Sequence, residues 1–492
     1  MGARAWALLL VLCGTIFLEG ADIAMLAIAI PTIRSDLDLS TATAAWVISS
    51  YVLGYAGFTL LGGRAADLLG RRRMFLTWLG VFLVFSGLGG FATEGWMLIG
   101  ARFVTGVAAA FMTPAAMSII TTSYAEGPER NKALLVFAGT SAGGFSLGLV
   151  IGGLLTELGW QWVFFAPVFF AALILAAAIR LVPAPPAAPR REKAARTGGF
   201  DLPGAAAAAG AMLLLAYGVV RLEHGLEDWP PTAAAVVAGL LLIAAFVAIE
   251  RRTAVPLVRL GIFRTGSVVR AGLGALLFLG AFMGFQFVVT LYLQELRGWS
   301  SWQTAIALVI MGCDVVLAPT LTPVLVNRFG HARVILGGFL LAALAYALFL
   351  PVGLDWTYWA MLPTLFLAGC AFALAYGPLM IAATDGVPEA EQGLAGGLLH
   401  TATQFGAAIG ISAVTAVYGL ASGGSAGGGH GGAGAEETLG AFRSALAVPV
   451  GLAALGVAVA LAGVLRKRSR AGQPAARSDE PGAVLSAASD AR

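Results

Sequence analysis

Long apolar segments alternate with short polar ones along the whole chain. A helix needs about 20 mostly apolar residues to cross a bilayer, and fourteen segments reach about that length. Such uninterrupted runs are typical of helices that lie in lipid. The pattern therefore predicts an all-α membrane protein with fourteen transmembrane helices. They are expected at residues 5–30, 43–62, 74–92, 96–119, 134–157, 162–179, 202–220, 232–249, 271–293, 303–325, 334–350, 356–384, 394–421 and 443–465.

The composition excludes a soluble protein. Of the 492 residues, 59% are apolar and 11% are charged, whereas an average soluble domain carries about 25% charged residues. The three cysteines lie inside apolar segments, without the spacing of a metal site or a disulfide framework. We therefore expect a lipid bilayer around the chain, and neither a metal site nor a cofactor.

The distribution of basic residues predicts the orientation in the membrane. If the N-terminus is cytoplasmic, 25 of the 30 Lys and Arg residues lie in cytoplasmic loops and termini. This bias fits the positive-inside rule and an even number of spans. We expect a multi-pass protein of the cell membrane with both termini in the cytoplasm. The alternative, a cleaved signal peptide over the first span, is disfavoured because the apolar run continues through Ile30.

Two loops repeat each other at an offset of 260 residues, which pairs Asp67 with Asn327 and Gly70 with Gly330. Spans 2 and 10 are therefore expected to be equivalent positions of two parallel six-span halves, with spans 7 and 8 inserted between them. Segments 183–199 and 422–437 are low-complexity and are expected to form a linker and an outer loop. The predicted units are a six-helix bundle with a cytoplasmic linker (1–200), an inserted helix pair (201–250), a second six-helix bundle (251–470) and a disordered tail (471–492).

The first of these loops resembles a family signature. Residues 63–75 are similar to the G-x-x-x-D-x-x-G-R-[RK] signature between the second and third helices of the major facilitator superfamily. Glycines suit a short turn, the acid can cap or pair at a helix end, and the arginines hold the loop in the cytoplasm. The alternative is an ordinary basic loop. The matching residues are Gly63, Asp67, Gly70, Arg71 and Arg72.

With fourteen spans, the chain resembles the drug:proton antiporter branch of that superfamily. Residues 21–33 are similar to the first-span motif of the branch and keep Asp22, but Ala27 replaces its asparagine. Arg102–Gly106 resembles the fourth-span motif, with Thr105 in place of glutamine. The resemblance implies two six-helix bundles plus an inserted helix pair.

Two further stretches carry the same resemblance. Residues 144–153 are similar to the antiporter motif G-x-x-x-G-P-x-x-G-G, with Leu149 in place of its proline. Residues 393–410 resemble the thirteenth span of the branch. The departures from the motifs leave substrate and coupling open.

Charged residues inside spans are costly and need an explanation. Glu19 and Asp22 are three residues apart and share a helix face, so close carboxylates there could not both ionise easily. The resemblance implies that Asp22 carries the proton and that Arg102 takes part in proton transfer. A fixed structural pair of Asp22 with Arg102 is the alternative. Asp314 is expected to attract cationic substrates or to make a capping or interhelical hydrogen bond.

Small residues recur on the fifth span at Gly144, Gly148 and Gly152, next to Gly153. Small residues at this spacing let helices approach closely. We expect this stripe to form a sliding surface between the two halves, or else an ordinary helix contact.

Polar and aromatic residues inside the spans are candidates for the substrate site. A cavity lined by aromatic, apolar and a few acidic groups suits large amphipathic molecules, including cations. Besides Asp314, the expected cavity-facing residues are Trp46, Tyr51, Phe282, Gln286, His400 and Gln404.

Enzyme motifs are missing or misplaced. No lysine follows a glycine, so there is no Walker A loop, and no histidine precedes a glutamate, so there is no HExxH zinc motif. Two G-x-S-x-G matches lie in a predicted span and a glycine tract rather than after a strand. No basic, aromatic-studded domain suggests a nucleic-acid partner. We therefore do not expect an enzyme.

The predicted function is proton-coupled efflux of amphipathic, drug-like or antibiotic compounds across the bacterial cytoplasmic membrane. The expected partners are a small amphipathic substrate, protons and lipid, and the expected state is a monomer. The alternatives are a dedicated exporter of a single metabolite and a non-transporting membrane sensor or scaffold.

Overall fold

The computed structural model describes residues 2–39, 41–183, 201–221, 229–253, 256, 258–421 and 435–471. Most of the predicted linker 183–199, most of the predicted outer loop 422–437 and the tail after Ala471 lie outside these residues. Within the described ranges the chain is almost entirely helical and contains no strand.

The helices follow the predicted segments in order. The first six are α1 (Ala3–Asp36), α2 (Thr41–Leu69), α3 (Arg71–Gly90), α4 (Gly95–Ser123), α5 (Pro128–Leu158) and α6 (Trp162–Leu181). The next two are α8 (Leu202–Arg221) and α9 (Trp229–Glu250). The last are α10 (Gly266–Leu291), α11 (Ser301–Leu308), α12 (Asp314–Phe329), α13 (His331–Phe349), α14 (Tyr358–Thr384), α15 (Gln392–Ala421) and α16 (Ala435–Ala471).

Twelve helical segments among the described residues are long and apolar enough to cross a membrane. The two other predicted spans correspond to α2 and to α8, whose apolar stretch, Pro203–Val219, is shorter. The chain is therefore a multi-pass membrane protein, and a total of fourteen spans remains a prediction.

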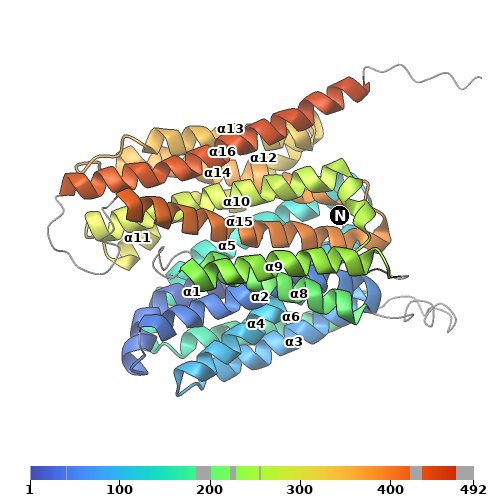
Figure 1. Cartoon of the computed structure of the whole chain (residues 1–492), viewed down its shortest axis with the longest axis horizontal. Helices are drawn as coiled ribbons and strands as arrows, with labels where there is room; N and C mark the ends of the chain where they lie inside the picture. The colour runs from blue at the N-terminus through green and yellow to red at the C-terminus, as the bar shows by residue number, and fades with distance from the viewer. Residues whose placement is uncertain are drawn as a thin grey trace, which may run out of the picture.

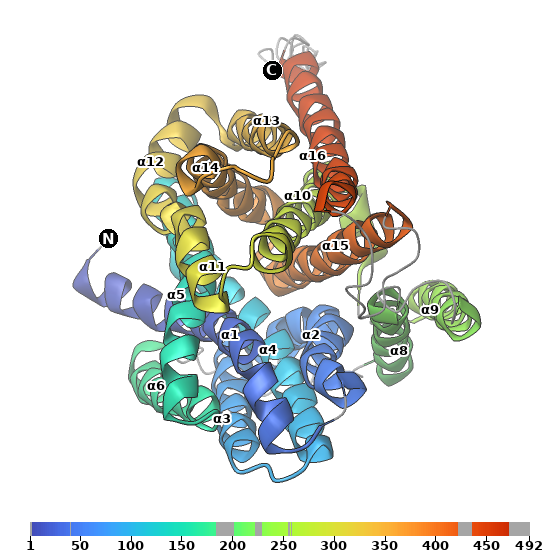
Figure 2. The ribbon, with the colours of Figure 1, turned by 90° about the vertical axis from the view of Figure 1, so that its left-hand side faces the viewer.

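The helices form two bundles with α8 and α9 beside them (Figures 1 and 2). In one bundle α1 packs on α5, α2 on α4, and α3 on α4 and α6. In the other, α10 packs on α15, and α13 on α14 and α16. This repeated set of partners agrees with two equivalent halves. The halves meet mainly along α2 with α15 and α5 with α12, and α8 packs on α2 and α9.

The turns of the two repeated loops have the same geometry. Gly70 joins α2 to α3 with a φ of +99°, and Gly330 joins α12 to α13 with a φ of +79°. A positive φ is unfavourable for residues with a Cβ atom. The glycines that revealed the repeat are therefore required by the backbone at both turns.

The tenth predicted span, 303–325, lies within the helical segment Trp302–Phe329, which is long and apolar enough to cross a membrane. The 3₁₀ segment η5 (Val309–Cys313) separates α11 from α12. A Cβ atom on Gly312 would lie 2.9 Å from Oγ of Ser146 on α5. The interrupted helix thus approaches the other half closely at its break.

The glycine stripe of α5 lies inside one half, not between the two halves as one of our expectations had it. Cβ atoms on Gly148 and Gly152 would lie 2.6 Å from the Cα atoms of Ala21 and Met25 on α1, and Gly144 faces Phe17 in the same way. The stripe therefore makes an ordinary helix contact.

Gly153 differs from the stripe because it points away from α1. A Cβ atom there would lie 3.4 Å from the ring of Trp302 on α11, in the other half.

Close packing of α2 on α4 predicts a stability difference between two glycines of the same helix. A Cβ atom on Gly106 would lie 2.2 Å from the backbone oxygen of Tyr51, whereas Gly100 has no neighbour within 4 Å. We expect Gly106→Ala to destabilise the purified protein by about 1–3 kcal/mol through overpacking. The matched control Gly100→Ala should be neutral or should stabilise by up to about 1 kcal/mol. Thermal unfolding in detergent measures both, and equal melting temperatures would contradict this packing.

Candidate functional site

A cavity of about 340 Å³ lies between the two halves. Its walls come from α1, α2 and α5 of one half and from α10, α11, α14 and α15 of the other. Most lining residues are apolar, and Leu149, at the position of the motif proline, is one of them. The lining residues with larger polar groups are Glu19, Tyr55, Gln286, Tyr376, His400 and Gln404.

Four of the predicted substrate residues line this cavity: Phe282, Gln286, His400 and Gln404. His400 is buried, and its Nε2 atom has no hydrogen-bond partner in the part of the chain that the structure describes. The two tyrosines, Tyr55 and Tyr376, were not predicted. Tyr55 has a recognisable signal in the sequence, because it falls on the same helical face of α2 as the lining residues Ile48 and Val52.

Trp46 and Tyr51 do not line the cavity, which corrects their prediction. Trp46 stacks on Tyr217 of α8, with ring centroids 6.0 Å apart. Tyr51 is buried, and the guanidinium carbon of Arg102 lies 4.4 Å from its ring centroid. Both positions are off the helical face of α2 that forms the cavity wall.

Asp22 forms a buried ion pair with Arg102 on α4. Nη1 of Arg102 donates a hydrogen bond to Oδ2 of Asp22, and each residue is 2% exposed. Neither residue lines the cavity. Thr105, which replaces the motif glutamine, donates its hydroxyl to the backbone oxygen of Arg102 at 3.0 Å. The structure therefore contains the pairing that the sequence left as an alternative.

Glu19 lies one helical turn from Asp22 and has different partners. Its Oε2 atom accepts a hydrogen bond from the hydroxyl of Thr113 on α4 at 2.6 Å, and Tyr55 is a second hydrogen-bond partner. Glu19 lines the cavity, whereas Asp22 does not. The two carboxylates thus share a helix but sit in separate environments, one beside neutral groups and one beside a cation.

Asp314 is fully buried and does not line the cavity. This position does not support direct contact with a cationic substrate, although Met311 and Gly312 of the adjacent break are lining residues. The interruption of the helix, which the sequence did not predict, changes the phase of the residues that follow it.

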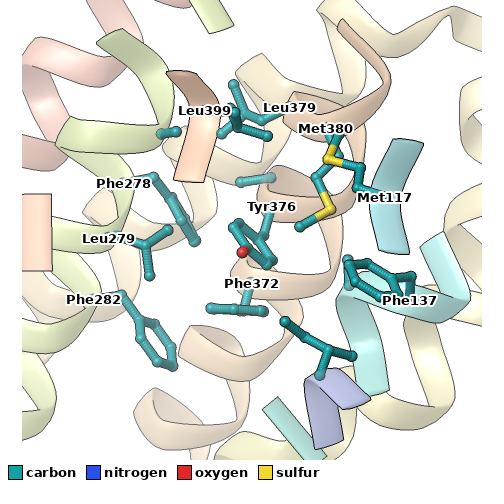
Figure 3. Packing of buried hydrophobic residues seen from close by; sticks show 14 of the residues in the cluster. Met117, Phe137, Phe278, Leu279, Phe282, Phe372, Tyr376, Leu379, Met380 and Leu399 are labelled. Atoms are coloured by element: carbon teal, nitrogen blue, oxygen red, sulfur yellow. The ribbon is translucent and has the colours of Figure 1, made fainter. Parts of the chain in front are cut away.

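Buried apolar side chains pack around the cavity-lining residues Phe282, Phe372 and Tyr376 (Figure 3). Met117 of α4 lies next to Met380 of α14 there, Phe137 of α5 and Leu399 of α15 belong to the same cluster, and all four are at most 1% exposed. Met380 lies one turn before Thr384, the last residue of α14. Met380 thus lies toward the end of the bundle that contains Asp67, which we call the Asp67 end.

Polar contacts join the two halves at the Asp67 end. The carboxylate of Asp67 accepts hydrogen bonds from the backbone N–H groups of Gly393 at 3.1 Å and Leu394 at 3.0 Å, in the first turn of α15. A helix N-terminus attracts negative charge. A Cβ atom on Gly63 would lie 2.3 Å from the backbone oxygen of Gly393, so only glycine fits there.

Two arginines make further polar contacts between the halves at the Asp67 end. Arg71 forms an ion pair with Glu389 at 3.2 Å. Arg130, at the start of α5, donates to Oε1 of Gln392 at 3.2 Å. Nothing in the sequence distinguished Arg130 from other basic loop residues. Arg72 instead donates to the backbone of Ile179 in its own half.

Comparison with known proteins gives the family. The sequence profile of the Major Facilitator Superfamily matches residues 12–411, so the chain belongs to this family of membrane transporters. The human organic anion transporter MFSD10 (TETRAN) has the same fold, with a TM-score of 0.67 over 94% of this chain and all of that chain, at 15% identity.

Two similar proteins have names that refer to antibiotics. The puromycin resistance protein pur8 of Streptomyces alboniger is 34% identical over 84% of this chain and 82% of its own length. The cephamycin export protein CmcT of Amycolatopsis lactamdurans is 35% identical over 85% of this chain and 86% of its own length. The family and branch resemblance inferred from the motifs are thereby supported at the level of whole sequences.

The buried ion pair predicts strong energetic coupling between Asp22 and Arg102. Removing one partner leaves an uncompensated buried charge, at a cost of about 3–5 kcal/mol. We expect Asp22→Leu and Arg102→Met each to destabilise the purified protein by about this amount. The double variant should lose much less than the sum of the two. Thermal unfolding of all four proteins measures the coupling, and strictly additive losses would contradict it.

Proposed function

We propose that the protein is a proton-coupled exporter of amphipathic, drug-like or antibiotic compounds, working by alternating access. Two similar proteins named for antibiotic resistance or export support the substrate class. Proton coupling is typical of this branch of the family. A cavity that both halves line, with closing contacts at one end, supports alternating access.

The charge distribution supports the orientation. The basic loops group at the Asp67 end, and such loops stay on the cytoplasmic side. We assign the Asp67 end to the cytoplasm of a bacterial cell and place both termini there. In this orientation, the structure corresponds to a state with its cytoplasmic path closed.

The observation that carries the proposal is the position of Glu19. It is the acidic residue that lines the cavity, and its hydrogen-bond partners, Thr113 and Tyr55, are neutral. A carboxylate without a counter-charge can bind a proton or a cationic group of a substrate, but not both. Competition between the two couples substrate release to proton uptake.

Asp22 has a different role in this scheme. Its charge is already balanced by Arg102, so it gains a proton only if that pair loosens. Asp22 is on α1 and Arg102 is on α4, so protonation of Asp22 would remove the ion pair and weaken the α1–α4 contact. We therefore assign substrate exchange to Glu19 and conformational coupling to Asp22 and Arg102.

The remaining wall supports an amphipathic substrate. Phe282, Leu279 and Phe372 supply apolar surface, and Gln286 and Gln404 supply amide groups. Sites for drug-sized ligands have volumes of about 300–1,000 Å³, so the cavity of about 340 Å³ fits one molecule. Since one chain forms the whole cavity, we propose a monomer surrounded by lipid.

A dedicated exporter of one compound is the second candidate. The named relatives are each called after a single antibiotic, and the cavity is at the small end of the usual range. A panel of substrates, including puromycin, a cephamycin and ethidium, separates the two. Export of one class alone identifies the dedicated exporter. The third alternative, a non-transporting sensor or scaffold, is motivated by the motif departures Ala27, Thr105 and Leu149. It predicts that none of the compounds in the panel is exported.

Ethidium efflux from intact cells tests the proposal. We expect cells that express the wild type to expel the dye and to lose this ability with a protonophore. Glu19→Gln should slow efflux roughly tenfold or more, equivalent to a loss of at least about 1.4 kcal/mol. Asp22→Asn should also be impaired, because it disrupts the pair with Arg102.

Glu157→Gln is the matched control, because this acid lies on the exposed surface of α5. It should expel ethidium at the wild-type rate, and amounts of each variant in the membrane must be equal. Unchanged efflux in Glu19→Gln, or wild-type efflux that persists with the protonophore, would refute the assigned coupling.

A further inference from the structure

A second cavity, of about 740 Å³, lies within the second bundle. Its lining residues come from α10, α13, α14 and α16 and from the 3₁₀ segment η3 (Leu260–Arg264) with Thr265 after it. The four helices lie next to one another in that bundle (Figure 2). This cavity shares no lining residue with the cavity between the halves, so the proposed export mechanism gives it no role.

One end of the second cavity is basic. Arg264 and Arg270 line it, together with His331 at the start of α13. One acidic residue, Asp385, also lines it, and its Oδ2 atom lies 4.0 Å from Nε2 of His331. The two arginines therefore leave a surplus of positive charge at this end.

The two arginines sit in different surroundings. Arg264 is exposed, and its guanidinium makes no hydrogen bond or ion pair with the residues that the structure describes. Arg270 is partly buried. A Cβ atom on Gly266 would lie 2.8 Å from its Nη1 atom, and one on Gly463 would lie 3.6 Å from its Nε atom. Arg270 is thus held between the first turn of α10 and α16, while Arg264 is open to a ligand.

Two helices begin at the same end of the cavity. α10 starts at Gly266 and α13 at His331, and both residues line the cavity. The first N–H groups of a helix carry partial positive charge. They add to the field of the two arginines, and an anion is favoured at this end.

The rest of the cavity wall is mostly apolar. Gly274 and Phe339 line it eight residues after the starts of α10 and α13, which is about 12 Å along each helix. Ile335, Leu379 and Val459 belong to the same wall. All five residues lie in helical segments that are long and apolar enough to cross a membrane. The apolar wall therefore runs from the start of these helices into their membrane-spanning part.

A ligand that matches both ends has an anionic headgroup and a hydrocarbon chain. A free anion would leave the apolar wall uncovered, and a neutral lipid would leave the arginines without a counter-charge. Basic pockets between transmembrane helices on the cytoplasmic side suit anionic lipid headgroups. We infer that this cavity binds an anionic phospholipid, with its phosphate beside Arg264 and Arg270 and an acyl chain along the wall toward Phe339.

The lipid site lies at the Asp67 end of the molecule. His331 follows Gly330, the repeat equivalent of Gly70, and Asp385 follows Thr384, whose backbone oxygen accepts a hydrogen bond from Arg130 at 3.2 Å. Its assignment to the cytoplasmic leaflet rests on the orientation proposed above. Lipid binding itself goes beyond the proposed export function and does not require it.

Thermal unfolding of the purified full-length protein in a neutral detergent tests the site. A ligand that binds only the folded protein raises the melting temperature in proportion to its occupancy. We expect phosphatidylglycerol to raise it in a saturable way. Phosphatidylcholine with the same acyl chains, and sodium phosphate at the same concentration, should each raise it much less.

Three arginine variants locate the binding. Arg264→Gln and Arg270→Gln should each weaken the apparent affinity for phosphatidylglycerol about fivefold, the usual contribution of one basic side chain next to an anionic lipid. Arg264→Lys, which keeps the charge, should retain most of the affinity. Arg333→Gln is the matched control, because Arg333 is an exposed arginine of α13 that does not line the cavity. It should bind the lipid like the wild type. Since Arg264 is exposed, its variants decide the test if Arg270→Gln does not fold.

Four results would overturn the inference. Equal stabilisation by phosphatidylcholine would show that the headgroup charge is not recognised, and equal stabilisation by sodium phosphate would show an anion site without a lipid. Equal losses in Arg333→Gln and Arg264→Gln would indicate general surface charge instead of this cavity. Wild-type affinity in Arg264→Gln would place the lipid elsewhere. None of these measurements depends on transport, so failure of the lipid site and failure of the export function are separate outcomes.

Discussion

The scarcity of water in the membrane interior is the constraint on which this structure depends. Backbone polar groups without water must pair within helices, and the described chain accordingly has almost no other regular structure. Charged side chains there need partners as well. Arg102 meets this requirement with Asp22, and Asp67 meets it with the first turn of α15. The carboxylate oxygens of Asp314 have no hydrogen-bond partner among the described residues.

The scarcity of water also relates the contacts that close the Asp67 end to the properties of the cavity. At the Asp67 end, polar contacts between the halves involve Asp67, Arg71 and Arg130. Near them, Met117 and Met380 belong to a cluster of fully buried apolar side chains (Figure 3). The cavity keeps few polar groups. When the halves move and water enters, the charged form of an ionisable side chain in the cavity wall is therefore stabilised.

Helical phase explains which site residues the sequence could identify. Phe282 with Gln286, and His400 with Gln404, are pairs four residues apart, and each pair lines the cavity as expected. Trp46 and Tyr51 have equally suitable chemistry but lie off the cavity face of α2. Composition alone does not give the rotation of a helix, because an apolar helix can present any face to lipid or to its neighbours.

The sequence by itself determined the class of protein and the approximate position of every described span, because the bilayer fixes the length of an apolar run. It also determined the repeat, through glycines that a positive φ requires at residues 70 and 330. Tertiary structure alone decided that the Gly144 stripe faces α1, that Glu19 and Asp22 have separate partners, and that the tenth span breaks before Asp314. These features depend on contacts between distant segments, and local sequence patterns carry no record of such contacts.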